Sequence, residues 1–400
     1  MEENRHNIRH NIRGKVVKEP SEEPSKKPLK KPLKNIFARA ISVVLTAILV
    51  LSAFMCGLCG CGAKKVKYDK DVETVTFVDS CNREVEVPKE VTRVAPSGAL
   101  ATMFLAVVCP EYMVCISSTP SSSQYKFLDS SIIKLPTTGQ LYGSKSTINL
   151  ETLMAAEPQV IIDLGDRKEG INHDMTSLQN QSGIATVYIE SDLPHMANAF
   201  RMLGKLLSGK EEKCEELAQY VEETVSLAEQ NREKISEDDM ISVAYGTGTS
   251  GLAMNAAEST QAQVIDFIGA KNAVVVDDVS NKGGGNNINM EQLYIFDPDV
   301  IIFSKGSMYD KCADDKAWNQ LRAVKNDDYY EIPSSPYNWM GSPPSLNMLL
   351  GIRWLGNLLY PDLYQLDMAA EAKRYYKLMW NYDLSDEEIT DMLSKSTYKK

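Results

Sequence analysis

Two segments of this chain, separated by 140 residues, share one pattern. Residues 149–162 read NLETLMAAEPQVII and residues 289–302 read NMEQLYIFDPDVII, identical at seven of fourteen positions without a gap. In each, the Asn can cap a short helix, the Glu suits its first turn, and an acidic residue followed by Pro ends it. The Val-Ile-Ile that follows is typical of a strand buried on both faces of a parallel sheet. The spacing is too long for a solenoid, so the repeat predicts two similar α/β lobes with a cleft between them.

The first 60 residues have the layout of a secretory signal. They contain eleven Lys or Arg against five Glu, and a mostly apolar stretch covers residues 40–60. The end of this stretch, Leu58-Cys59-Gly60-Cys61, resembles the lipobox of bacterial lipoproteins and predicts a lipid on Cys61. The alternative is an uncleaved membrane anchor, because the stretch is long enough to span a bilayer. Either interpretation places the rest of the chain outside the cytoplasmic membrane.

The composition of the remaining chain excludes several functions. It has 32 Lys or Arg against 49 Asp or Glu and no basic stripe, so nucleic-acid binding is not expected. No C-x-x-C pair occurs among its five cysteines besides Cys61, which argues against a disulfide framework or a zinc site. Cys109 and Cys115 could bridge a short loop, but buried free thiols are expected. No Ser-His-Asp set or P-loop is present, so no enzymatic activity is predicted.

About 340 residues exceed one ordinary core, so two domains are expected. Alternating strand and helix patterns over residues 72–192 and 238–384 predict Rossmann-like α/β lobes with parallel sheets. Residues 193–237 would join them through one long α-helix over Glu211–Ile235, whose apolar residues recur on one face. An ordinary surface helix of one lobe is the alternative. Residues 61–71 are predicted to be a flexible tether and 385–400 a C-terminal tail.

The N-terminal lobe should begin with a hairpin over residues 75–87. Further strands are expected at Met113–Ile116, Val160–Leu164, Ala185–Ile189, Ile241–Tyr245, Ala273–Val276, Val300–Ser304 and Tyr329–Ile332.

A set of features in one order resembles a known family. It comprises the lipobox, Arg83-Glu-Val-Glu-Val-Pro, both repeats, the long helix, Trp318–Lys325 and Leu358-Leu-Tyr-Pro-Asp. Together they resemble the substrate-binding lipoproteins of ABC importers for iron-siderophores, haem and corrinoids, over residues 72–380. The resemblance implies two lobes joined by one rigid helix, a metal chelate held between them and delivery to a membrane permease. It also implies a monomer on the extracytoplasmic face of the cell membrane that performs no chemistry and needs no cofactor.

The resemblance gives the repeated glutamates a second role. In this family one acidic residue at the start of each repeat helix docks on basic residues of the permease, which here implies Glu151 and Glu291. From the helix dipole alone, the same residues are simply favourable in a first turn.

Ligands of open α/β sheets bind beyond the carboxyl ends of the strands, where the loops of this chain carry several suitable side chains. The aromatic ones could stack on a flat apolar chelate, and the cationic ones could meet its carboxylates. For the aromatic side chains the alternative is packing in the core or at its rim. For the cationic side chains the alternative is exposure on a solvated loop. The candidate ligand-binding residues are Ser97, Gly98, Tyr142, Arg167, Tyr245, Lys305, Tyr337 and Trp339.

Other ligand classes remain open. Residues 342–345 open a helix whose free N–H groups could hold an oxyanion, so molybdate or tungstate is the second candidate. Direct metal ligation is not expected, because the exported part has only His173 and His195, and His195 is predicted to pack at a helix start. Ligation of haem iron by Tyr stays open. Less favoured hypotheses are a chelatase-like metal-inserting enzyme and a surface protein that holds a partner without transport.

The long helix also predicts how much the lobes move. Bending a helix sharply requires Pro, Gly or an inserted group, and residues 211–235 contain neither Pro nor Gly. We therefore expect a small closure on ligand binding, with local ordering of the loops near Tyr245 and Trp339.

Overall fold

The computed structural model describes residues 66, 71–142, 147–281 and 284–399. The predicted leader, the lipidation site Cys61 and most of the predicted tether lie outside the described residues. The chain divides into two units, Met1–Cys61 and Gly62–Lys400, and the fold described is that of the second. In the described part of the chain, no helix is long and apolar enough to cross a membrane.

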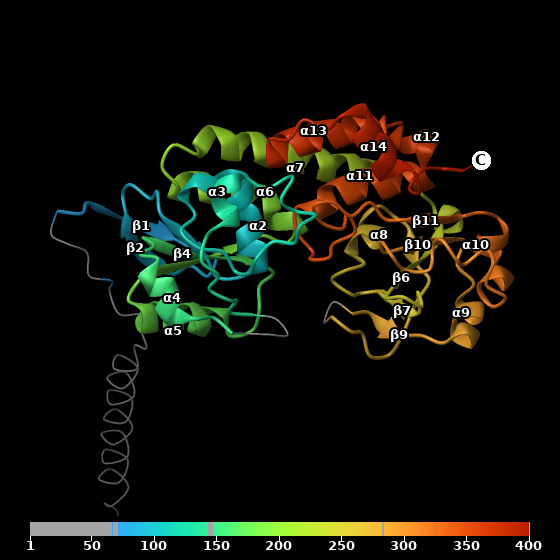
Figure 1. Cartoon of the computed structure of the whole chain (residues 1–400), viewed down its shortest axis with the longest axis horizontal. Coiled ribbons are helices and arrows are strands. Elements are labelled where there is room, and N and C mark those ends of the chain that lie inside the picture. The colour runs from blue at the N-terminus through green and yellow to red at the C-terminus, as the bar shows by residue number, and fades with distance from the viewer. Residues whose placement is uncertain (1–65, 67–70, 143–146, 282–283, 400) are drawn as a thin grey trace, which may run out of the picture. The chain divides into compact units, whose positions relative to one another are not determined.

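The N-terminal lobe, the part built on β1 to β5, contains two small sheets (Figure 1). β1 (Thr74–Val78) and β2 (Glu84–Pro88) form the predicted antiparallel hairpin. β3 (Val94–Pro96), β4 (Val160–Gly165) and β5 (Ala185–Glu190) form a parallel sheet in that order.

The C-terminal lobe, the part built on β6 to β11, contains one mixed sheet. β6 pairs in parallel with β8 and β10, and β10 pairs in parallel with β11. β7 and β9 extend this sheet in antiparallel orientation. Its strands are β6 (Ser242–Thr247), β7 (Ala253–Met254), β8 (Lys271–Asn272), β9 (Asn286–Asn287), β10 (Val300–Phe303) and β11 (Tyr329–Glu331). The predicted α/β class with parallel sheets is confirmed, with an antiparallel extension that was not predicted.

Two predicted strands are wrong. Residues Met113–Ile116 form only isolated bridges. The prediction at Ala273–Val276 is replaced by the two-residue β8, after which Val274 accepts a backbone hydrogen bond from Ala257. A short apolar run does not distinguish a buried loop from a strand, because both bury the same side chains.

The two sequence repeats fold in the same way. Asn149 caps α4 (Leu150–Ala155) and Asn289 caps α9 (Met290–Phe296), each by accepting a hydrogen bond from the amide three residues later. The acidic residue before each proline has a positive φ, 50° in the first repeat and 37° in the second, and the chain then enters a strand. The predicted helix-to-strand pattern is therefore confirmed in both lobes.

The strand of each repeat is buried on both faces. In β4, Val160 and Ile162 belong to the main core, whereas Ile161 belongs to a smaller core beneath α4 and α5. In β10, Ile302 belongs to the main core and Ile301 to a separate core of the C-terminal lobe. The two-residue alternation explains why a continuous β-branched run is needed at these positions.

The long helix α7 (Glu211–Arg232) contacts both lobes. It packs against α6 on one side and against α8, α11 and α12 on the other, and Figure 1 shows it alongside α11 and α13. Its buried residues join those of both lobes in one continuous core. The helix ends three residues before the predicted Ile235, where the amide of Ile235 closes a tighter turn on the Arg232 carbonyl.

Shorter helices cover the sheets. Those of the N-terminal lobe are α2 (Ala99–Val108), α3 (Ser130–Ile133), α4, α5 (Ile171–Ser182) and α6 (Met196–Leu206). Those after β6 are α8 (Gln263–Phe267), α9, α10 (Arg322–Lys325), α11 (Asn347–Leu359), α12 (Pro361–Tyr364), α13 (Met368–Trp380) and α14 (Asp386–Leu393). The last of these lies in the segment predicted as a tail and buries Ile389 and Leu393.

Candidate functional site

A small cavity lies where the two lobes meet. It encloses about 120 Å³ between α2 and residues 116–132 of the N-terminal lobe and Tyr337 and Pro343 of the C-terminal lobe. Its walls are mainly apolar, with a few hydroxyl and amide groups. The apolar side chains include Met103, Ile116, Leu128 and Ile132, and the polar ones are Thr102, Ser117, Ser118 and Gln124.

Tyr337, a predicted ligand residue, lies in this cavity wall. Its ring centroid is 5.7 Å from that of Trp380 on α13, which holds the ring in place. Burial raises the pKa of Tyr337 to about 12, so the phenol is neutral at physiological pH. The side chain can therefore offer an apolar face and a hydroxyl donor to a ligand.

A second cavity of about 350 Å³ lies on the other side of residues 123–128. Ser123, Lys126 and Phe127 contribute from the N-terminal lobe, and Lys305 from the end of β10. Because Gln124 and Leu128 line the first cavity, residues 123–128 form the partition between the two spaces. Displacement of this segment, which we call the partition segment, would join them.

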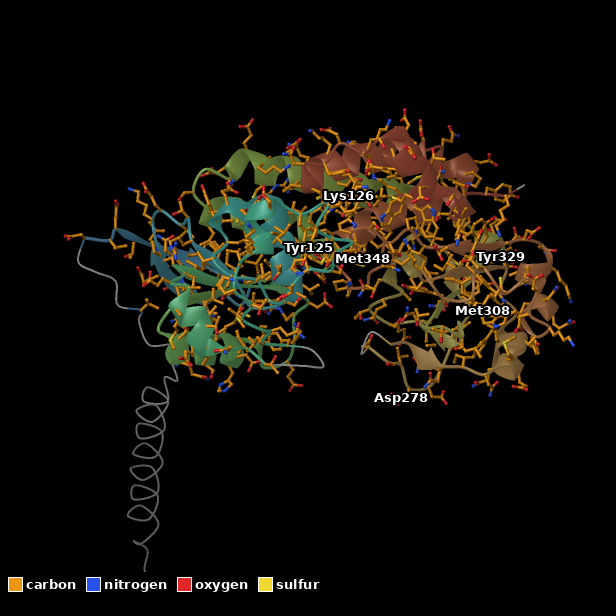
Figure 2. The ribbon with its side chains drawn as sticks, viewed as in Figure 1. Tyr125, Lys126, Asp278, Met308, Tyr329 and Met348 are labelled. Carbon is orange, nitrogen blue, oxygen red and sulfur yellow. The ribbon has the colours of Figure 1, made fainter. Side chains whose placement is uncertain are left out.

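The partition segment is held by the C-terminal helices. The ring of Phe127 packs edge-on against Tyr376 and Tyr382, with centroids 5.3 and 5.0 Å apart. Lys126 forms an ion pair with Glu388, and this contact holds the pKa of that carboxyl at about 2. Figure 2 shows Lys126 and Tyr125 on a loop that reaches toward the C-terminal helices. The lobes thus contact each other directly as well as through α7.

Ser97 and Gly98 lie at the carboxyl end of β3, as predicted, but do not line either cavity. Ser97 is 1% exposed, and its hydroxyl donates to the carboxylate of Asp163. Gly98 is the N-cap of α2 in an extended conformation. Burial raises the pKa of Asp163 to about 6, and one of its oxygens has no hydrogen-bond partner among the described residues. Contact of Ser97 or Gly98 with a ligand stays a prediction.

Tyr142 and Arg167 are occupied by neighbours within the N-terminal lobe. The hydroxyl of Tyr142 donates to Asp174 at 2.8 Å, and the Lys168 amine lies 4.1 Å from its ring centroid. Arg167 donates to Glu190 and to the Ser80 carbonyl. Neither lines the interlobe cavities, so their role as ligand contacts stays a prediction.

Tyr245 and Trp339 are core residues of the C-terminal lobe in this structure, at 0% and 1% exposure. The Tyr245 hydroxyl donates to the Asn338 side chain at 3.3 Å, and Trp339 packs edge-on against Trp354. A Cβ on Gly351 would lie 2.0 Å from the Trp339 carbonyl oxygen, so α11 and this loop are in close contact. Both rings anchor the loop, and contact with a ligand would require the loop to move.

Of the eight predicted ligand residues, Tyr337 and Lys305 line the interlobe cavities, and Lys305 is exposed. Glu151 and Glu291 are exposed in the first turns of α4 and α9, where the repeat places them. Permease docking by these two glutamates stays a prediction.

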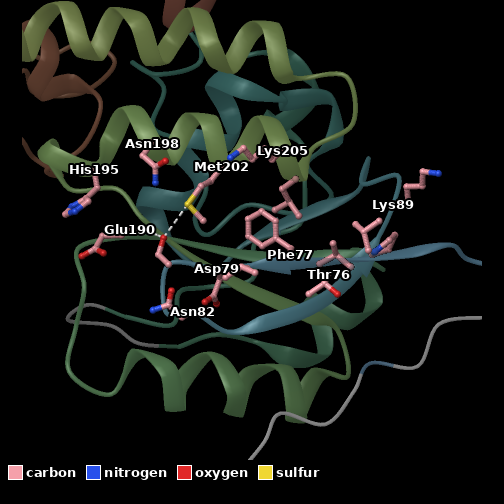
Figure 3. A pocket seen from close by; sticks show the side chains of 16 residues that line it. Thr76, Phe77, Asp79, Asn82, Lys89, Glu190, His195, Asn198, Met202 and Lys205 are labelled. Atoms are coloured by element: carbon pink, nitrogen blue, oxygen red, sulfur yellow. Dashed lines mark hydrogen bonds between the residues drawn. The ribbon is translucent and has the colours of Figure 1, made fainter.

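A larger cavity of about 640 Å³ lies between the β1–β2 hairpin and α6. Figure 3 shows Glu190 and His195 at one end of it and Lys89 at the other. The His195 side chain is 51% exposed, with Nδ1 2.5 Å from Asp192 Oδ1. The predicted packing of His195 is therefore wrong, because the start of α6 leaves the ring at the surface.

Glu190, Asp192 and His195 are a group in the described residues whose ligand atoms lie within 4.8 Å of one another. The Arg167 guanidinium is already 3.2 Å from Glu190, so a metal ion would have to displace a cation to bind there. We assign no metal site to this group.

The cysteines of the described part are free. Cys109 and Cys115 are buried separately, as are Cys214 and Cys312, while Cys81 is half-buried. Burial raises the pKa of the Cys115 thiol to about 11, which keeps it protonated and unreactive. The expectation of free thiols is confirmed.

Most of the cavity-lining residues were not predicted, among them Lys126 and Phe127, and neither was Asp163, which accepts a hydrogen bond from Ser97 away from the cavities. Asp163 carries a usable signal, because it is a single carboxylate inside the apolar run of β4. Lys126 and Phe127 lie in a serine-rich loop with no periodicity, and only the packing of α13 and α14 against it shows their position.

The fold and the interlobe cavities define a two-lobed α/β binding protein. The profile of the periplasmic binding protein family matches residues 105–336, and the chain belongs to this family. It is 21% identical over 330 residues to an uncharacterized ABC transporter substrate-binding lipoprotein of Bacillus subtilis, covering 80% of this chain and 97% of that one. The protein is an ABC transporter substrate-binding protein, a class that binds and transports rather than catalyses.

Solved structures have the same fold. An ABC transporter solute binding protein from Sulfurospirillum deleyianum superposes with a TM-score of 0.73 at 26% identity, covering 80% of this chain and 99% of that one. The molybdate periplasmic binding protein of Haemophilus influenzae, bound to molybdate, gives a TM-score of 0.60 at 15% identity, covering 78% and 99%. The second likeness concerns the fold alone.

Proposed function

We propose that this protein is anchored by lipid on the extracytoplasmic face of the cell membrane. There it captures a metal chelate, such as an iron-siderophore, haem or a corrinoid, and delivers it to the permease of an ABC importer. The observation that carries this proposal is the aromatic and apolar lining of the cavity at the lobe junction, with Tyr337 held in its wall. An apolar pocket with few polar groups suits a bulky organic chelate.

The size of the cavity requires a movement on binding. Ligand pockets for organic molecules measure roughly 300–1,000 Å³, and this one encloses about 120 Å³. Displacing the partition segment would add the neighbouring 350 Å³ and bring Lys305 to the ligand. The lysine would then be available for the carboxylates of a chelate.

In this proposal residues 1–60 are the leader, 61–71 the tether, 72–192 and 238–384 the lobes, and 193–237 the interdomain helix region. Lipid on Cys61 holds the monomeric protein at the membrane. Replacing Cys61 with Ser should release the protein from the membrane fraction. Retention of that variant with an intact leader would instead support the uncleaved anchor.

Glu151 and Glu291 would dock on basic residues of the permease. Both are exposed, and neither lines an interlobe cavity. Glu151→Gln and Glu291→Gln should therefore reduce uptake while leaving ligand affinity unchanged. Reduced affinity would place the two glutamates in the binding site instead.

Tryptophan emission offers a direct test of the ligand class. The tryptophan emission of the purified protein should change on adding one of ferric siderophores, haem or cobalamin. In Tyr337→Ala the affinity obtained from this titration should be about tenfold weaker. Tyr398→Ala, an exposed tyrosine outside the interlobe cavities, is the matched control. A protein that responds to none of these chelates would contradict the proposal.

An oxyanion is the second candidate, favoured by one observation. Ser345 is buried just before α11, and its hydroxyl has no hydrogen-bond partner among the described residues. A helix start with an unpaired hydroxyl can hold molybdate or tungstate. A response to molybdate alone in the same titration would establish this candidate.

A further inference from the structure

The repeat is preserved in burial as well as in sequence. Residues 151–160 and 291–300 have the same burial class at nine of ten positions. Leu153 and Leu293 are fully buried in both, which orients the two helices identically on their lobes. The outward faces of α4 and α9 are therefore equivalent surfaces of the two lobes.

Each of these faces exposes an apolar side chain beside its glutamate. Met154, three residues after Glu151, is 42% exposed. Tyr294 is 39% exposed and Ile295 is 81% exposed, three and four residues after Glu291. Positions three and four residues apart are neighbours on one helix face, so carboxylate and apolar group form one surface.

Folding does not explain this arrangement. A single exposed apolar residue is ordinary. Here apolar side chains are exposed at equivalent positions of the two lobes, each time next to the repeated glutamate. Packing does not require this exposure, because the buried leucines already attach both helices to their lobes. The Tyr294 hydroxyl also donates to the Ala317 carbonyl at 2.9 Å, which fixes the orientation of the ring. The surface is ordered before any partner binds.

We propose that α4 and α9 dock on the membrane permease through a mixed contact, a carboxylate plus an apolar side chain from each lobe. The apolar part is larger on α9. This inference rests on the proposed docking of Glu151 and Glu291 and adds the apolar component to it.

Two observations favour the permease as the occupant. Neither α4 nor α9 contains Lys or Arg, so both faces are acidic and complement a basic partner. The faces also belong to different lobes, and the partner must reach both. Figure 1 shows the two helices in the half of the fold away from α7, which leaves them uncovered by it. The relatives that this chain matches are named as substrate-binding lipoproteins of ABC transporters, and the other part of such a transporter lies in the membrane.

Photocrosslinking tests the contact in membranes of the native cell. The full-length protein carries p-benzoylphenylalanine at position 295, or at position 291, and crosslinked products are identified by mass spectrometry. Val275, 63% exposed in the same lobe but off α9, is the matched control position. We expect the membrane subunit of an importer to be captured from positions 295 and 291 and not from 275.

Binding measurements separate the two components. With the captured permease in detergent, Ile295→Ser should weaken binding about tenfold at low and high salt alike. Glu291→Gln should weaken binding mainly at low salt, because only the ionic part is screened. Unchanged melting temperatures would show that both variants fold.

Each other outcome is decisive. Capture from position 291 but not 295 overturns the apolar contact and leaves the docking role of the glutamates intact. If the permease is captured from neither position, both the apolar contact and the docking role of the glutamates are overturned. Crosslinking to a second copy of this chain would show that the surface is a self-association site.

Discussion

Arg353 on α11 is a cation almost wholly inside the protein, at 1% exposure. Its three guanidinium nitrogens donate to Thr224, Glu223 and Glu371, each at 2.9 Å, and its carbon lies 4.8 Å from the ring centroid of Tyr220. A buried charge is tolerated only when fully paired, and here the partners lie on α7 and α13. One side chain thus ties the long helix to the C-terminal helices.

Replacing Arg353 with Met should lower the free energy of unfolding by about 3 kcal/mol, because two carboxylates lose their buried partner. Urea denaturation monitored by circular dichroism measures this change. Arg374→Met is the control, since Arg374 also pairs with Glu223 but is half-exposed. That variant should lose less than about 1 kcal/mol. An equal loss of unfolding free energy in the two variants would show that the burial of Arg353 does not cause the larger destabilisation.

Asp163 makes stability depend on pH in the opposite sense from a paired surface carboxylate. Burial raises its pKa from 3.8 to about 6, so the folded protein favours the protonated form. The penalty for ionisation is fully present above about pH 6 and shrinks as the pH falls toward 3.8. Asp163→Asn should therefore melt higher than wild type at pH 7.5, with the difference decreasing toward pH 4.5. A difference independent of pH would contradict burial as the cause.

At the scale of elements, the partition segment contacts α13 through Phe127 and α14 through Lys126, and α2 of the same lobe also contacts α13. Phe127 is 6% exposed between two tyrosine rings, whereas the ion pair of Lys126 with Glu388 is partly exposed. The packing of Phe127 should therefore contribute more than the ion pair to the binding of the segment by these helices. Because the segment separates the two cavities, its detachment would control access of a large ligand.

Phe127→Ala should increase the association rate of the ligand, since the segment detaches more often. It should also cost about 3 kcal/mol of stability, as for other buried Phe to Ala changes. Stopped-flow tryptophan emission with the chelate found by titration measures the rate. Lys126→Gln is the control and should change both quantities little. An unchanged or slower association in Phe127→Ala would argue that the segment does not control entry.

At the scale of the whole molecule, α7 packs against both lobes without Pro or Gly in its interior. Its buried residues are continuous with the cores of both lobes, so bending it would disrupt packing on either side. Motion on ligand binding should therefore be confined to loops such as the partition segment.

Spin labels at positions 181 and 320, exposed in the N-terminal and C-terminal lobes respectively, test this rigidity. A background in which Cys56, Cys59, Cys61 and Cys81 are replaced by Ser limits labelling to these sites, because the four remaining cysteines are buried. The distance distribution should change by only a few ångströms between free and ligand-bound protein. A shift of about 10 Å or more, the scale of hinge closure, would defeat the prediction of small closure.

Local patterns in the sequence predicted the elements whose signal is contained within a few residues. The capping Asn149 and Asn289, the buried strands that follow them and the hairpin all form as expected, because caps and period-two alternation act over short distances. The extent of α7 was predicted to within three residues, because the recurrence of apolar residues on one helix face is also a local pattern. The two failed strands lie where apolar residues are buried by loops, a difference that exists only in three dimensions.

The sequence by itself determined that this protein has two related α/β lobes joined by a long helix, because the repeat and the helical period are written along the chain. Which side chains meet between the lobes was decided only by the tertiary structure. Tyr337 lines the cavity while Trp339, two residues away, is buried in the core, and no local pattern distinguishes them. The physical reason is that burial depends on contacts with α11 and α13 and with residues 116–132 more than 200 positions earlier, and such contacts have no signature in the neighbouring sequence.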